Sequence, residues 1–122
     1  MATDPPTPTL ADVAARAAVV CDPDGAQAGV ADFARRLEDR TEPITAAADI
    51  ETEVAEVKGA IDPQDEDPAV MMAAAVTVYL AHRRDEVTDA PADILRLSAR
   101  AEFDGTPPAH VTDWLAQHGV TA

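Results

Sequence analysis

The residues best suited to chemistry in this chain are three histidines, one cysteine and two groups of arginines. His110 and His118 are eight residues apart, about two helical turns, with Trp114 between them on the same face. One tetrahedral metal ion cannot readily take both imidazoles, and His82 is remote in the sequence. The spacing therefore predicts capping or solvent-edge roles for the histidines and no metal site. Trp114 is expected in the core, although an exposed tryptophan would mark a binding surface.

The single cysteine, Cys21, excludes an internal disulfide and any zinc site built on several cysteines. It stands at the predicted carboxyl end of a helix, and Asp22 and Asp24 follow it, a setting that disfavours the thiolate. We therefore expect Cys21 to be a small buried hydrophobic residue. The segment from Asp22 to Gly25 has the composition of a calcium loop, but Gln27 occupies the sixth position, where such a loop needs glycine.

Two further kinds of charged group could bind ligands. The acidic group before the fourth predicted helix consists of Asp62, Asp65, Glu66 and Asp67. Its spacing fits no coordinating loop, which favours a solvated linker whose last carboxylates cap a helix. The basic groups are Arg35, Arg36 and Arg40, and His82, Arg83 and Arg84. Each could clamp a phosphate, and each also suits the dipole of a helix carboxyl end. Because no phosphate loop, nucleophile elbow or zinc-protease motif is present, we predict no catalytic residue and no cofactor.

Hydrophobic periodicity and capping residues predict six helices and no strand. The predicted ranges are 10–21, 26–39, 45–61, 68–81, 91–102 and 106–119. Thr9 and Asp12 form a capping box before the first helix, and Asp67 is a good amino cap for the fourth. Gly105 fits the left-handed position after the fifth helix. Helix lengths and linkers vary, so no internal repeat of constant period is evident.

The fourth predicted helix is apolar on almost every face, so other helices or a second subunit must cover it. The sequence therefore predicts an all-α fold, a compact orthogonal bundle of five to six short helices around this central helix. We expect one helical domain over 9–120 and a disordered, proline-rich arm over 1–8. Substituting Val78 with aspartate should then bury a charge. The residues expected to be least exposed are Met71, Ala74, Ala75, Val78 and Leu80.

Charge is the most unusual property of the composition. The chain has 23 acidic and 9 basic residues, a formal net charge of -14, and Lys58 as its only lysine. This pattern resembles the proteins of extreme halophiles, although an acidic protein of a GC-rich bacterium is the alternative. Disorder is disfavoured because 47% of the residues are hydrophobic. The longest apolar run, 69–81, is too short to span a bilayer, and the amino terminus has no secretory signal, which favours a cytoplasmic protein.

Two classes of function are compatible with these features. The first is a non-catalytic helical interaction module that binds another protein, or a second copy of itself, through an uncovered strip of the fourth helix. Its expected partner-binding residues are Arg83, Arg84, Glu86 and Trp114. The alternative is a nucleic-acid-associated regulator whose last two helices form a helix-turn-helix, but the last helix has neither arginine nor lysine. An enzyme of unfamiliar type would need a polar pocket that joins His82 to other titratable groups.

Overall fold

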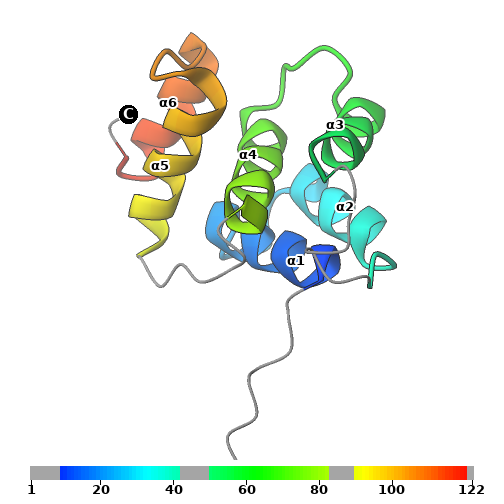
Figure 1. Ribbon diagram of the computed structural model, residues 1–122. Helices are drawn as coiled ribbons and strands as arrows, with labels where there is room; N and C mark the ends of the chain where they lie inside the picture. The colour runs from blue at the N-terminus through cyan, green and yellow to red at the C-terminus, as the bar shows by residue number, and fades with distance from the viewer. Residues whose placement is uncertain (1–8, 42–49, 83–89, 121–122) are drawn as a thin grey trace, which may run out of the picture.

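The computed structural model describes residues 9–41, 50–82 and 90–120, which form six α-helices (Figure 1). The helices are α1 (Leu10–Cys21), α2 (Ala28–Leu37), α3 (Ile50–Ile61), α4 (Pro68–His82), α5 (Pro91–Phe103) and α6 (Ala109–Gln117). No β-strand occurs in these three ranges, so the predicted all-α class is confirmed. The predicted arm over 1–8 lies outside the described residues.

α1 and α4 begin at the residues that the predicted capping residues indicated. Thr9 Oγ1 accepts the backbone N–H of Asp12 at 3.1 Å, and the Asp12 carboxylate accepts the N–H of Thr9 at 3.0 Å, which completes the capping box of α1. Asp67 Oδ1 accepts the N–H of Ala69 at 3.1 Å at the start of α4. After α5, Gly105 has the positive φ expected of it, 82°, but the carboxyl cap is Asp104, which is also left-handed with a φ of 52°.

The connection between α1 and α2 is organised by Asp22. Its carboxylate accepts the backbone N–H of Ala26 at 2.9 Å and that of Gln27 at 2.8 Å. Because the loop uses these two donors and Gln27 is extended, α2 begins at Ala28 and not at residue 26 as predicted. The predicted end was also too late, since α2 stops at Leu37.

The connection between α3 and α4 repeats this arrangement 40 residues later (62 - 22 = 40). Here the Asp62 carboxylate accepts the backbone N–H of Glu66 at 2.9 Å and that of Asp67 at 3.0 Å. Asp65 has a φ of 54°, at the position where the first connection has Gly25 with a φ of 67°. The two helix pairs therefore share one connecting conformation, a local repeat that the sequence reasoning missed.

The remaining boundaries differ from the predictions only at their ends. The first five residues predicted for the third helix, 45–49, lie outside the described residues. In α6 the extended backbone of Pro108, with a ψ of 155°, makes that residue the amino cap, so the helix starts at Ala109 and not at residue 106. It ends before Gly119, whose φ of 75° is left-handed.

α4 is the centre of the bundle and packs against each of the other five helices (Figure 1). Met71, Ala74, Ala75 and Leu80 are buried, as predicted. The prediction for Val78 was wrong, because its side chain is only partly buried. The helices around α4 leave one strip of its surface open, and Val78 lies on that strip. Within the described ranges, no helix is both long enough and apolar enough to cross a membrane.

A pair of glycine substitutions tests the close approach of α2 to α4. A Cβ added at Gly29 would lie 2.7 Å from Val70 Cγ2 and 3.1 Å from Asp67 Oδ2. We expect Gly29→Ala to lower the free energy of unfolding by about 1–2 kcal/mol, since Val70 is buried and cannot move aside. Gly59 in α3 has open space around it, so Gly59→Ala should raise stability by about 0.5–1 kcal/mol. Urea titration measures both, and a stabilising Gly29→Ala would contradict the close packing.

Candidate functional site

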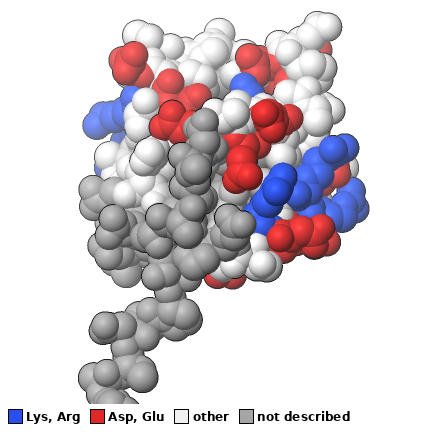
Figure 2. All heavy atoms as spheres, turned by 45° about the vertical axis from the view of Figure 1, so that its right-hand side comes forward, with Lys and Arg blue, Asp and Glu red and all other residues white. Residues whose placement is uncertain are grey.

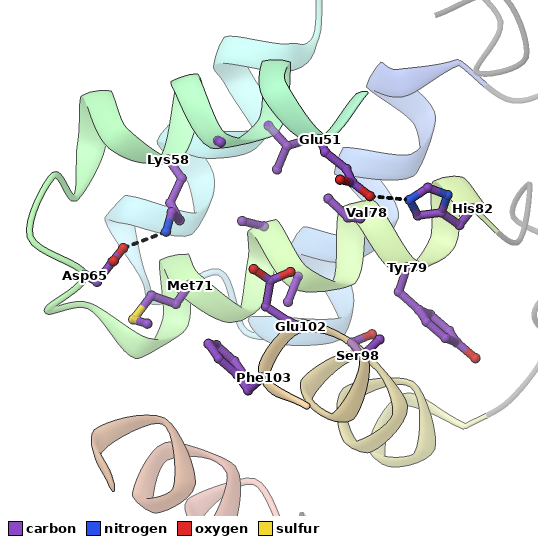
Figure 3. Close-up of a pocket in the computed structure, with 15 residues that line it drawn as sticks. Glu51, Lys58, Asp65, Met71, Val78, Tyr79, His82, Ser98, Glu102 and Phe103 are labelled. Atoms are coloured by element: carbon purple, nitrogen blue, oxygen red, sulfur yellow. Dashed lines mark hydrogen bonds and ion pairs between the residues drawn. The ribbon is translucent and has the colours of Figure 1, made fainter. Parts of the chain in front are cut away.

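An open groove of about 570 Å³ runs along α4 between α3 and α5 (Figure 3). Its α3 wall is formed by Glu51, Val54, Ala55 and Lys58, and its α5 wall by Ser98, Ala101, Glu102 and Phe103. The floor is formed by the α4 residues Met71, Ala74, Ala75, Val78, Tyr79 and His82, and Asp65 closes one end. The volume lies within the range of small-ligand pockets and can also hold several side chains of a protein partner.

The groove follows from helical periodicity in three neighbouring helices. On α3 the lining residues are spaced i, i+3, i+4 and i+7, so they form one face of that helix. On α4 the small side chains of Ala74 and Ala75 leave the floor low. Val78 continues this floor one turn later, which explains its partial exposure. The result is a channel with a mainly apolar floor and with polar groups on its walls and at its ends.

Two ion pairs close the ends of the groove, as the dashed lines in Figure 3 show. Lys58 Nζ is 2.6 Å from Asp65 Oδ1 at one end. His82 Nε2 is 2.8 Å from Glu51 Oε1 at the other, which links α4 to α3 and forms an ion pair when the imidazole is protonated. Glu102 extends from α5 between these ends, and no described residue pairs with its carboxylate.

The groove therefore does join His82 to other titratable groups, the feature that an unfamiliar enzyme would need. A carboxylate beside an imidazole can orient it as a general base. However, the side chains of His82 and Glu51 are 64% and 67% exposed, so water surrounds the pair. Ser98, the hydroxyl residue of the α5 wall, makes no hydrogen bond to any described residue, so His82 does not activate it as a nucleophile.

Of the four residues predicted to bind a partner, only Trp114 lies in the part of the chain that the structure describes, and it does not line this groove. Arg83, Arg84 and Glu86 lie outside the described residues. Trp114 is 7% exposed and belongs to the core, as the periodicity of its helix indicated. Its ring stacks on that of His118, with ring centroids 3.9 Å apart. Trp114 therefore contributes to packing in α6 and is not part of the groove lining.

The two other histidines, His110 and His118, contact backbone carbonyl oxygens. His118 Nδ1 lies 2.8 Å from the carbonyl oxygen of Trp114 at the end of α6. His110 Nε2 lies 2.8 Å from the carbonyl oxygen of Asp65, so it ties the start of α6 to the loop before α4. These contacts agree with the capping and edge roles expected for the histidines. In the described ranges, no three His, Cys, Asp or Glu side chains come together as a possible metal site.

The arginines of α2 are largely occupied by carboxylates. Arg35 and Arg36 both contact Asp32, at 2.9 Å and 3.3 Å, and the hydrogen bond from Arg35 makes the largest contribution to lowering the pKa of Asp32. Arg40 lies 3.9 Å from Glu53. On the face shown in Figure 2, basic side chains gather mainly at one edge beside acidic ones. All three arginines of this group therefore already contact carboxylates, and two of them share one, which disfavours a phosphate clamp.

Comparison with known proteins adds no assignment to this geometry. No family model, curated protein or solved structure matches the chain.

Cys21 is fully buried, as predicted, and burial, followed by the charge of Asp22, raises the pKa of its thiol. We expect the thiol to react with iodoacetamide only when the protein unfolds, because the folded state hides it and disfavours the thiolate. Mass spectrometry after a timed reaction, with and without urea, measures this. Rapid labelling of the folded protein would show that the end of α1 opens readily.

Proposed function

We propose that this chain is a non-catalytic protein-interaction module whose groove over α4 binds a helical segment of another protein or of a second copy. The observation that carries the proposal is the uncovered strip of α4. That helix is apolar on almost every side, five helices pack against it, and Val78 still remains partly exposed between α3 and α5. A helix laid along the strip would cover it, as in other helix-in-groove complexes.

The nucleic-acid alternative has weaker support. α6 has neither lysine nor arginine among its residues, and it packs chiefly on α4. A recognition helix needs donors that reach base edges and cations that contact phosphates. We further propose that the protein works in a salt-rich cytoplasm, on the basis of the net charge of -14.

The proposal is tested by affinity capture from a lysate of the native organism in molar KCl, with wild-type protein and two single variants as bait. Val78→Asp places a charge in the groove, and Val19→Asp places one on the surface of α1, where Val19 is 65% exposed. We expect wild type and Val19→Asp to retain the same protein and Val78→Asp to lose it. Apolar burial persists in high salt, so this association should survive molar KCl.

Sedimentation of each bait, alone and with duplex DNA, tests for self-association and for DNA binding. Self-association that Val78→Asp abolishes would identify a second copy as the partner. Equal capture by all three baits would contradict the assignment to the groove. A monomer that captures no protein and shifts only with DNA, in a salt-dependent manner, would favour the regulator alternative.

A further inference from the structure

The α5 wall of the groove contains a buried hydroxyl without a partner. Ser98 is 0% exposed and lines the groove, and its Oγ makes no hydrogen bond to any described residue. The other buried hydroxyl of the core behaves differently, since Thr77 Oγ1 donates to the carbonyl oxygen of Ala73 at 2.7 Å. Leaving a buried hydroxyl unpaired is unfavourable, so its presence beside a groove points to a hydrogen bond that a bound molecule supplies.

Glu102 lies one helical turn after Ser98, so the two side chains occupy the same face of α5. The other carboxylates of the groove already have partners, since Glu51 contacts the His82 imidazole and Asp65 contacts Lys58. The carboxylate of Glu102 has no partner among the described residues. α5 therefore presents a carboxylate and a hydroxyl, both unpartnered, side by side along the groove.

We infer that the groove binds a basic amphipathic helix, one of whose lysine or arginine side chains contacts both Glu102 and Ser98. This inference rests on the proposed function and specifies the class of partner. An ammonium or guanidinium group carries several N–H donors, so one cation can donate to both oxygens. Its hydrogen bond to the Glu102 carboxylate is charge-assisted.

The rest of the groove fits the same partner. Glu51, Asp65 and Glu102 give the lining three carboxylates against one lysine, so a cationic segment is attracted and an acidic one is repelled. The floor at Ala74 and Ala75 suits apolar side chains on the adjacent turns of the bound helix. Because Ser98 Oγ is closed to solvent, a wall side chain must rotate as the cation reaches it.

The experiment uses a displayed library of helical peptides with an alanine and leucine stripe and random residues beside it. The library is selected against the full chain, at the lowest KCl concentration that keeps the chain folded. We expect lysine or arginine to be enriched at one flanking position. Changing that residue of a selected peptide to methionine should weaken its binding roughly tenfold, the effect of losing one charge-assisted hydrogen bond.

Three variants make the outcome decisive. With Glu102→Gln the preference for the lysine peptide over the methionine peptide should fall several-fold, because the amide oxygen can still accept a hydrogen bond from the ammonium but no longer carries the opposite charge. Ser98→Ala should weaken the lysine peptide without lowering the melting temperature, since the hydroxyl makes no bond in the protein itself. Val78→Asp should bind no peptide. If the selected peptides share an apolar stripe but no basic position, the inference is wrong. It is also wrong if Glu102→Gln does not change their preference for a basic residue. In both cases the proposed function still stands. If no peptide binds the wild type above the Val78→Asp background, the proposed function itself fails.

Discussion

Substituting Val76 with aspartate is expected to unfold the domain at low denaturant, whereas Val78→Asp, two residues along the same helix, is expected to leave it folded. Val76 is fully buried in the core, so its replacement places an uncompensated charge among apolar side chains. The expected loss is about 4 kcal/mol or more, comparable with the whole stability of a small domain. Val78 borders the open groove, where an aspartate stays in contact with water, and the expected loss there is about 1 kcal/mol or less.

Circular dichroism with urea titration measures the pair directly. The sequence alone predicted a large loss of stability for Val78→Asp, since α4 has no polar face. Comparing the two variants therefore distinguishes the burial that the sequence predicted for Val78 from the partial exposure that the structure shows. Equal and severe destabilisation by both substitutions would mean that another part of the protein, or a second copy, covers the groove.

A steep rise in stability with KCl is the second large effect that we expect. At 0.1 M salt the Debye length is about 10 Å, and two like charges at that distance in water repel by about 0.4 kcal/mol before screening. Many such pairs exist on a molecule with a net charge of -14. At 1 M salt the Debye length falls to about 3 Å, and this repulsion largely disappears.

Molar salt also weakens attractive pairs, but each pair among the described residues has at least one exposed side chain. Such pairs contribute about 0–1 kcal/mol each. The balance therefore favours stabilisation, with a rise in melting temperature of roughly 10 °C or more, which corresponds to about 2 kcal/mol for a chain of this length. Thermal unfolding at 0.1, 0.5, 1 and 2 M KCl provides the measurement. A flat profile would remove the argument for a halophilic origin.

Local sequence signals predicted the helices well because their causes lie within a few residues. The capping box at Thr9 and the cap at Asp67 are both confirmed. The start of α2 was misplaced because the carboxylate of Asp22 takes two backbone donors four and five residues ahead. Nothing in the composition of that segment separates this loop from an earlier helix start.

The groove could not be read from the sequence, because it depends on where α3 and α5 lie beside α4. An exposed strip on α4 was anticipated, but Ser98 and Glu102 were not recognised as candidates. Ser98 is buried, and only the structure reveals that its hydroxyl lacks a partner among the described residues. One weak signal was available: Ala55 and Ala101 are small residues facing an alanine-rich helix, a pattern that leaves room between helices.

The position of α4 in the chain has a consequence for synthesis. α1 packs closely on α4, although Cys21 and Pro68 are separated by 47 residues (68 - 21 = 47). A nascent chain that has released only α1, α2 and α3 therefore lacks the helix against which their apolar stripes pack. Folding of this domain cannot be completed from the amino end inward, and until α4 leaves the ribosome the three helices expose apolar surface to chaperones and to other nascent chains.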